Sequence, residues 1–326
     1  MAEKTLRIPT VLSSDELTDK AFSRAAKIFK NGTNSLDTKK KTALAKITAS
    51  GDVIKSTLDS YVERFPRMDE RDGFYPELVN LVIGLDQYKK SLGAVNWASN
   101  RAEKLKNEAL RNIRRSKDEK IIENVRSSFY GRLSSVLKQI SKDLLFLQDA
   151  KNKFRKLPHI SPDVPTAVVA GFPNVGKSNL VTHMSTAAPE IAPYPFTTKG
   201  IVIGHLERDH KKYQIIDTPG LLDRSIEERN DIEKQAVLAL KYLTNVMIFL
   251  LDPSESCGYS MEKQTSLLNS VKKGFKGVPI IVAESKSDLF VSKSKNIKFS
   301  AETGENLDVL VETVLNELRK VDDNIQ

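Results

Sequence analysis

An eight-residue stretch near the middle of the chain has the residue types and spacing of a phosphate-binding loop. Residues 171–178 read GFPNVGKS, which fits the pattern G-x-x-x-x-G-K-S. Lys177 is expected to reach the β- and γ-phosphates of a nucleotide, and the Ser178 hydroxyl is expected to bind Mg²⁺. The residues expected to contact the nucleotide here are Gly171, Phe172, Pro173, Asn174, Val175, Gly176, Lys177, Ser178 and Asn179.

The segments on both sides of this loop fit the pattern. Residues 166–170 form a short apolar run typical of a buried strand, and residues 179–184 can continue as a helix. A turn between a strand and a helix lets backbone N–H groups approach an anionic phosphate chain, and the positive end of the helix adds to the attraction. The loop by itself does not distinguish ATP from GTP.

Two further motifs predict contacts to Mg²⁺ and to the γ-phosphate. The stretch YPFTT at 194–198 precedes an expected strand at 200–205, and a threonine there can bind Mg²⁺ and sense the γ-phosphate. The stretch DTPG follows another expected strand. In it Asp217 can bind Mg²⁺ through water and Gly220 can donate its N–H to the γ-phosphate, with Thr218 and Pro219 completing the motif. Residues 206–214 are expected to form a turn between antiparallel strands.

The last two motifs favour guanine over adenine. Residues 246–251 and 279–283 read as buried parallel strands, and the second leads into SKSD at 285–288. Asp288 can accept both the N1–H and the exocyclic amine of guanine, while Lys286 lies over the base. After a further strand come Ser300, Ala301 and Glu302, where the Ala301 N–H would contact guanine O6. GTP and GDP are therefore the predicted ligands, with an ATP-binding P-loop protein as the alternative.

Two positions depart from the usual GTPase pattern. Ser285 stands where many GTPases have an asparagine that ties neighbouring loops together, so weaker guanine affinity is expected. Leu221 stands where many have a glutamine that orients the attacking water. Because leucine cannot hydrogen-bond, slow intrinsic hydrolysis is expected.

The elements that position these motifs divide the chain into two expected domains. Residues 161–326 alternate strands and helices, as in a doubly wound, mostly parallel α/β sheet. Residues 1–160 read as an all-α antiparallel bundle, because apolar residues recur at helical spacing over long segments. Its expected helices follow a capping box at Ser13 and Glu16, run from a cap at Asp37 to Pro66, and cover about 76–84, 86–115 and 118–156.

Charge is uneven between the two halves. Residues 1–160 hold 32 lysines and arginines against 20 acidic residues, whereas residues 161–326 hold 19 against 22. Such an asymmetry predicts contact with RNA or another polyanion, and the alternative is a solvated lysine-rich surface. A basic stripe at 101–117 would suit phosphate contacts.

Composition excludes several other classes. No apolar run approaches the roughly 18 residues of a membrane span, and residues 1–4 lack a signal-peptide pattern. Cys257 is the one cysteine, so neither an internal disulfide nor a cysteine-based metal cluster is expected. The prediction is a cytoplasmic protein with no membrane partner.

The motif set GFPNVGKS, YPFTTKG, DTPGLLD, SKSD and SAETGEN resembles the Obg-like branch of P-loop GTPases. Residues 86–96 (DQYKKSLGAVN), 157–160 (LPHI) and 223–230 (DRSIEERN) make the chain similar to the Nog family within it, including its short archaeal members. The resemblance implies a role in assembly of the large ribosomal subunit, with the helical half docking on precursor ribosomal RNA.

The same resemblance bears on two site residues. It places the switch threonine at Thr198 rather than Thr197, which makes Thr198 a third Mg²⁺ ligand beside Ser178 and Asp217. It also implies that Asn174 binds K⁺, which could substitute for an arginine finger; a simple turn hydrogen bond is the alternative. The expected catalytic set is thus Lys177, Thr198 and Asn174.

Three functions stay open from the sequence. The first is a GTPase whose nucleotide state controls release from a ribosomal precursor, with an unknown activating factor. The second is an RNA- or ribosome-docking module that binds guanine nucleotide structurally and barely hydrolyses it. The third is a signalling GTPase with protein partners.

Overall fold

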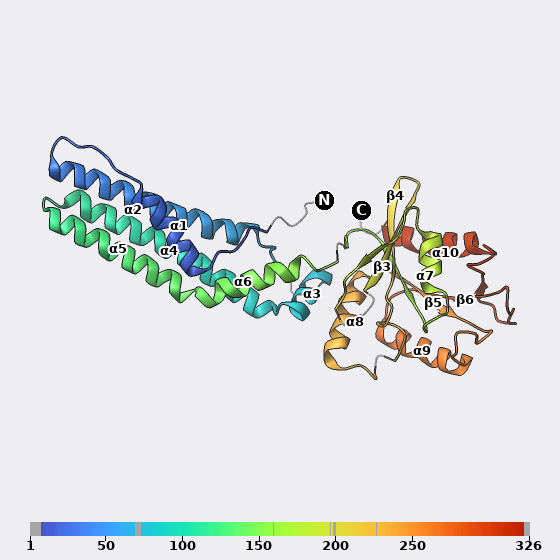
Figure 1. Ribbon diagram of the computed structural model, residues 1–326. Helices are drawn as coiled ribbons and strands as arrows, with labels where there is room; N and C mark the ends of the chain where they lie inside the picture. Colours follow the sequence, from blue (N-terminus) through green and yellow to red (C-terminus); the bar gives the residue numbers. More distant parts are fainter. Residues whose placement is uncertain are drawn as a thin grey trace. The chain divides into compact units, whose positions relative to one another are not determined.

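A computed structural model describes residues 8–68, 73–158, 160–195, 197, 200–225 and 227–322, with the side chain of the last of these left out. The chain forms two compact units (Figure 1). One comprises the described residues within Met1–Asp69 and Ile83–Arg155, and the other those within Glu70–Val82 and Lys156–Gln326.

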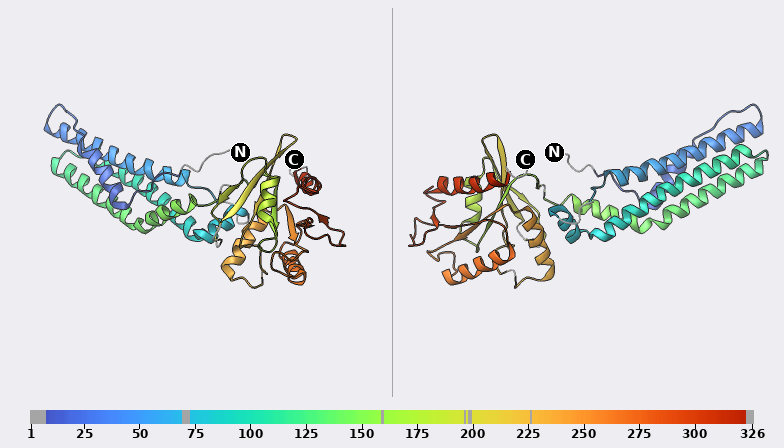
Figure 2. Two further views of the ribbon diagram at one scale, coloured as in Figure 1. Left: turned by 45° about the vertical axis from the view of Figure 1, so that its right-hand side comes forward. Right: turned by 180° about the vertical axis from the view of Figure 1, so that it is seen from behind.

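The first unit is a bundle of long helices. Their apolar faces meet in a core that includes Leu17, Ile47, Leu58, Ala102 and Leu133, all fully buried. Figure 2 shows the long helices running side by side. The helices are α1 (Ser14–Ala26), α2 (Ser35–Arg64), α4 (Leu85–Arg115), α5 (Glu119–Gln139) and α6 (Ser141–Phe154).

Helix boundaries in this unit agree with the sequence pattern in part. The expected capping box is present at α1, where Ser13 and Glu16 exchange hydrogen bonds with each other's backbone N–H. The cap of α2 is Asn34 rather than Asp37: the Asn34 side chain accepts from the Asp37 N–H, while the Asp37 carboxylate accepts from the Thr33 N–H. The prediction of Asp37 as the cap was therefore wrong by one turn.

The expected single helix over 118–156 is two helices. Ile140 leaves helical geometry, with φ −97° and ψ 12°, between α5 and α6. Its side chain stays buried, and α6 packs mainly against α4 rather than against α5. A continuous apolar seam does not reveal this break, because the buried side chains keep their spacing across it.

The second unit is built on a seven-stranded sheet in the order β2-β3-β4-β1-β5-β6-β7. The β2–β3 and β3–β4 pairs are antiparallel, and the four remaining pairs are parallel. The turn expected over 206–214 is shorter: β3 continues to Arg208 and β4 begins at Lys211. Only Asp209 and His210 lie between them, and their positive φ angles of 53° and 62° suit a tight hairpin. The strands are β1 (Thr166–Ala170), β2 (Glu190–Ala192), β3 (Ile201–Arg208), β4 (Lys211–Asp217), β5 (Val246–Leu251), β6 (Ile280–Glu284) and β7 (Ile297–Lys298).

Helices cover both faces of this sheet, as a doubly wound α/β fold requires (Figure 1). Apolar residues of α7 and α10 pack with β1, β4 and β5 in one core, while α8 and α9 lie on the opposite face of the sheet. The helices are α3 (Phe74–Val82), α7 (Lys177–Met184), α8 (Asp231–Leu243), α9 (Met261–Gly274) and α10 (Leu307–Asp322). The predicted fold class, a helical domain followed by an α/β GTPase-type domain, is confirmed.

Helix α3 belongs to the second unit, although it precedes most of the bundle in sequence. It packs against α8, and the Tyr75 hydroxyl donates to the Ile160 carbonyl at 2.6 Å. The expected boundary at residue 160 did not anticipate this placement of residues 73–82.

Candidate nucleotide-binding site

The P-loop joins β1 to α7 in a conformation that depends on its glycines. Gly171 has φ +138°, and a Cβ there would lie 2.7 Å from the Leu250 carbonyl oxygen, so only glycine fits. Asn174 and Gly176 also have positive φ, at 62° and 97°, and α7 begins at the next residue. Backbone of this kind directs successive N–H groups toward one side, as an anion-binding nest requires.

Lys177 folds back over its own loop. Its Nζ donates to the Gly171 and Phe172 carbonyl oxygens, at 2.9 and 2.8 Å. Burial lowers the pKa of the Lys177 ammonium, and the charges of Asp217 and Asp223 offset part of that effect. The lysine therefore braces the loop and places a desolvated positive charge beside it.

Ser178 and Asp217 meet at the expected metal position. The Ser178 hydroxyl donates to Asp217 Oδ2 at 2.6 Å, while Asp217 Oδ1 is buried without a partner. Burial raises the pKa of the Asp217 carboxyl, against the lowering effects of Ser178 and Lys177. One carboxylate and one hydroxyl suit Mg²⁺, which binds few protein oxygens and completes its shell with phosphate and water oxygens.

A second buried oxygen without a partner lies next to this pair. Thr218 Oγ1 is buried and has no hydrogen-bond partner. The adjoining turn is closed by the Leu221 N–H, which donates to the Thr218 carbonyl at 3.0 Å, and Gly220 adopts φ +80°. Leu221 itself is 1% exposed, so its side chain belongs to the core.

The proposed switch threonine falls in a partly described segment. Thr198 lies outside the described residues, so its predicted Mg²⁺ role is untested. The neighbouring Thr197 hydroxyl donates to the Tyr194 carbonyl at 2.9 Å. Tyr194 in turn donates its hydroxyl to the Ala236 carbonyl of α8.

The SKSD segment follows β6 and is held by side-chain contacts to two other segments. The Ser285 hydroxyl donates to the Leu251 carbonyl at 3.1 Å, and Ser287 donates to Glu305 Oε2 at 2.7 Å. Lys286 has φ +58°, and Asp288 is exposed. Ser285 thus ties the segment to the end of β5 by a single side-chain bond.

The loop expected to face guanine O6 is ordered by its serine. Ser300 is buried, and its hydroxyl accepts from the Glu302 and Thr303 N–H groups, each at 3.2 Å. The preceding Phe299 carbonyl accepts from the Ser287 N–H. The SKSD and SAE segments, 15 positions apart in the sequence, are therefore joined side by side.

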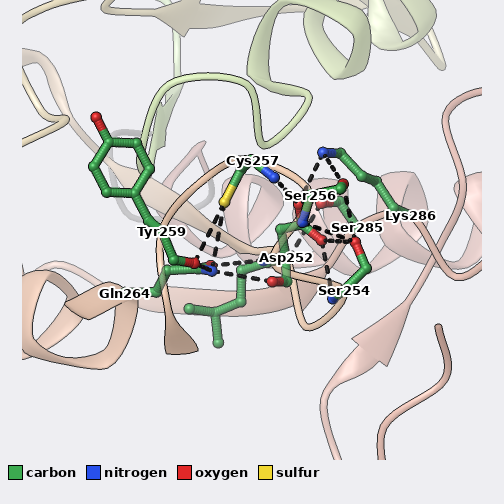
Figure 3. A network of polar contacts seen from close by, with 9 residues as sticks. Asp252, Ser254, Ser256, Cys257, Tyr259, Gln264, Ser285 and Lys286 are labelled. Carbon is green, nitrogen blue, oxygen red and sulfur yellow. Dashed lines mark hydrogen bonds and ion pairs between the residues drawn. The ribbon is translucent and has the colours of Figure 1, made fainter. Parts of the chain in front are cut away.

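A network centred on Asp252, the residue directly after β5, is not predicted by the sequence motifs (Figure 3). Its carboxylate is fully buried and pairs with Lys286 Nζ at 2.8 Å. It also accepts from Ser254, Ser256 and the Cys257 N–H. Burial raises the pKa of Asp252, but these bonds outweigh it and hold the pKa below its ordinary value.

Gln264 of α9 completes this network. Its amide accepts from the Asp252 N–H at 2.7 Å and donates to the carbonyls of Asp252 and Tyr259 (Figure 3). The Tyr259 ring stacks on Phe172 of the P-loop with centroids 4.1 Å apart. The 252–259 loop therefore connects the P-loop to Lys286. The signal available in the sequence was an aspartate at the carboxyl end of a buried strand.

Arg229 is another residue near the site that the sequence motifs do not predict. Its side chain is almost completely buried, Nε has no partner, and the nearest carboxylate oxygen, on Asp223, is 3.8 Å away. The guanidinium donates to the carbonyls of Gly220 and Arg224 at 3.5 and 3.3 Å. Arg229 thus links the end of the DTPG motif, at Gly220, to the backbone of Arg224.

Among the residues that the structure describes, no group of three or more His, Cys, Asp or Glu side chains is placed to hold a metal ion. Nor does that part of the chain contain a helix long and apolar enough to cross a bilayer.

This sheet order, the strand–loop–helix at 166–184 and the four following motifs define a P-loop GTPase domain, here with a helical domain before it. Residues 6–161 match the family model of the NOG1 N-terminal helical domain, and residues 231–288 match the model of Nucleolar GTP-binding protein 1 (NOG1). The chain belongs to the NOG1 family, which confirms the resemblance drawn from the motifs.

The chain is also similar to individual proteins. An uncharacterized protein of Methanocaldococcus jannaschii is 41% identical over 87% of this chain and 80% of its own length. Nucleolar GTP-binding protein 1 of Encephalitozoon cuniculi is 34% identical over 82% of this chain and 53% of its own. The chain thus spans about half the length of that relative. A crystal structure of a Plasmodium falciparum chain named nucleolar GTP-binding protein 1 is 33% identical, with TM-score 0.45, over 52% of this chain and 93% of that one.

Proposed function

We propose that this chain binds GTP with Mg²⁺, hydrolyses it to GDP and phosphate, and uses its nucleotide state to control association with a precursor of the large ribosomal subunit. The observation that carries the proposal is the contact between exposed Ser178 and fully buried Asp217, which keeps one carboxylate oxygen without a partner, beside the Lys177-braced P-loop. The relatives' name, GTP-binding protein, supports guanine nucleotide as the ligand.

In this proposal the protein supplies mainly position and electrostatics. Lys177 and the loop N–H groups neutralise charge on the transferred phosphoryl group. Ser178 and Asp217, with Thr198, would hold Mg²⁺, which would neutralise negative charge on the phosphates. Gly220 would donate its N–H to the γ-phosphate, which makes the DTPG segment the part that distinguishes GTP from GDP.

Guanine recognition is assigned to the SKSD and SAE segments. Asp288 is exposed and free to accept from the base, and Lys286 is held by Asp252 at the edge of the same site. The Ala301 N–H would meet guanine O6, in a loop that Ser300 orders. The single bond from Ser285 supports the expectation of modest affinity.

Slow hydrolysis follows from Leu221, which is buried and cannot orient water. Asn174 as a K⁺ ligand would offset this, and comparison of turnover in K⁺ and in Na⁺ tests it: equal rates for the unmodified protein would exclude the role. Thr198 stays the preferred switch residue, since the Thr197 hydroxyl is engaged by Tyr194. A Thr198→Ala variant that still switches, beside a Thr197→Ala variant that does not, would reverse that choice.

Docking is assigned to the helical unit. Residues 1–160 carry 32 basic against 20 acidic residues, which fits a surface that meets ribosomal RNA. The activating or exchange factor is not identified by these features. The expected cytoplasmic location stays a prediction.

Single-turnover hydrolysis tests the enzymatic part directly. The protein is loaded with GTP and Mg²⁺, and phosphate release is followed for the unmodified chain and for Lys177→Ala, with Lys212→Ala, on exposed β4 surface, as a charge-matched control. We expect slow release that Lys177→Ala abolishes and Lys212→Ala leaves unchanged. Release unaffected by Lys177→Ala would overturn the proposal.

Leu221 and Ser285 favour one alternative, a docking module that binds guanine nucleotide structurally. Comparison of particle release in GTP and in a non-hydrolysable analogue separates the two. Release that requires hydrolysis supports the GTPase switch, whereas identical behaviour in both nucleotides favours the docking module.

A further inference from the structure

The helical unit has an open groove of about 490 Å³ between α4 and α5. Leu105 and Val136 are buried in the core and form part of its floor. Its polar lining comes from both helices: Trp97, Asn100, Arg101 and Lys104 on α4, and Arg132 and Gln139 on α5. The volume lies within the range of small-ligand sites, large enough for a single nucleotide unit.

Trp97 is the chain's only tryptophan, and it is 47% exposed at this groove. Within the described residues no other ring stacks against its indole. Tryptophan suits a binding surface because it combines a large apolar ring with a polar N–H. A flat indole face at the wall of a groove is a platform on which an unpaired base can stack.

Two cations beside Trp97 are without a carboxylate partner among the described residues. Several other basic side chains of this unit are paired with carboxylates, such as Lys55 with Asp59 and Lys106 with Asp52. For Arg101 and Lys104, by contrast, the described part of the chain supplies no ion pair, and both are exposed. Arg132 has only a long contact, 3.5 Å, to Glu108. Two free cations one helical turn apart, next to an exposed ring, suit phosphates on either side of a stacked base.

We propose that this groove binds one unpaired nucleotide of single-stranded RNA, with the base on Trp97 and the flanking phosphates on Arg101 and Lys104. The amides of Asn100 and Gln139 present donors and acceptors to the base edge. The proposal rests on the RNA docking proposed above and specifies where, and to which form of RNA, the helical unit binds. An unpaired strand is required because a base inside a duplex cannot reach the indole.

The test uses the full chain and the emission of its single tryptophan. A ten-nucleotide oligoadenylate is titrated in, and we expect saturable quenching of Trp97. In parallel, anisotropy of the labelled oligonucleotide is measured for Trp97→Ala and for the double variant Arg101→Ala/Lys104→Ala. Each is expected to lose about tenfold in affinity, because the first variant loses the stacking platform and the second loses the phosphate contacts.

Lys89→Ala/Lys90→Ala is the matched control, because it removes two exposed cations from the same helix outside the groove lining. It is expected to lose less than about threefold. Circular dichroism confirms that each variant folds. Equal losses in the control and groove variants, or unchanged affinity in Trp97→Ala, would overturn the groove as a stacking site. Tighter binding of oligoglutamate than of oligoadenylate would overturn RNA as its occupant.

Failure of the groove and failure of RNA docking are distinguishable. The affinity of large-subunit ribosomal RNA is measured for the unmodified chain and for the same variants. If the groove variants bind this RNA as tightly as the unmodified chain does, the groove is excluded as the binding site but RNA docking is not. If the unmodified chain does not bind the RNA, both the groove and the proposed docking are excluded.

Discussion

The Asp252–Lys286 pair makes the sharpest prediction about guanine binding. Asp252 is fully buried after β5, and Lys286 Nζ lies 2.8 Å from its Oδ2 with a quarter of the lysine side chain exposed. Asp252→Asn keeps an acceptor oxygen and the shape of the side chain, but it removes the charge that holds Lys286. The lysine is then free to leave the position from which it would cover the base.

The expected magnitude follows from the kind of bond that is lost. A hydrogen bond to a charged group contributes roughly 1.5–3 kcal/mol, and partial exposure of Lys286 places this one near the lower end. A loss of about 1.5–2 kcal/mol corresponds to roughly 10- to 30-fold weaker nucleotide binding. Asp252→Ala should cost more, because it also leaves the Cys257 N–H unpaired inside the protein.

Equilibrium binding of fluorescent GDP and of a non-hydrolysable GTP analogue measures this effect. Both nucleotides should weaken by the same factor, because they share the base. Glu262→Gln, an exposed change on the neighbouring helix α9, is the control and should bind normally. A folded Asp252→Asn protein that binds GDP within twofold of the unmodified chain would refute the reasoning, as would a loss confined to the GTP analogue.

Three further predictions concern the rest of the site. Arg229→Met should weaken the GTP analogue about three- to tenfold more than GDP, because Arg229 holds the carbonyl of Gly220; equal losses would mean a purely structural role. Asp217→Asn should raise the thermal midpoint at pH 7.5 without nucleotide or Mg²⁺, because it removes the cost of burying a charged carboxylate. The rise should be about 2–4 °C for each kcal/mol of that cost. Because burial raises the pKa of Asp217, the stability that this carboxyl contributes is full at low pH and is lost as pH rises through that raised pKa. The difference in thermal midpoint between Asp217→Asn and the unmodified chain should therefore shrink toward pH 4. A difference that stays constant with pH would contradict the reasoning. Ser285→Asn should strengthen GDP binding several-fold in calorimetric titration, because one bond to Leu251 is all that its hydroxyl makes; unchanged affinity would show that this bond suffices.

The motifs were predictable because their chemistry is local. The positive φ angles of Asn174 and Gly176 and the start of α7 at Lys177 are set within a few residues. The contact of Ser178 with Asp217 follows from two adjacent parallel strands, β1 and β4, whose carboxyl ends meet at one edge. A sequence therefore specifies this part of the site almost completely.

The remaining features depend on distant packing, which the sequence pattern does not contain. Helix α3 lies in the second unit because its apolar face packs on α8, far along the chain. Asp252 becomes part of the site only once Lys286 and Gln264 are folded against it. Arg229 reads as an ordinary surface arginine until the loop closes around it.

Co-sedimentation with large-subunit ribosomal precursors tests the central claim most directly. The full chain is mixed with the particles in a non-hydrolysable GTP analogue, in GDP and without nucleotide, at fixed salt. The account predicts that binding changes between the GTP analogue and GDP, and that Lys177→Ala removes the difference. Equal binding in all three conditions, or no binding in any of them, would contradict it.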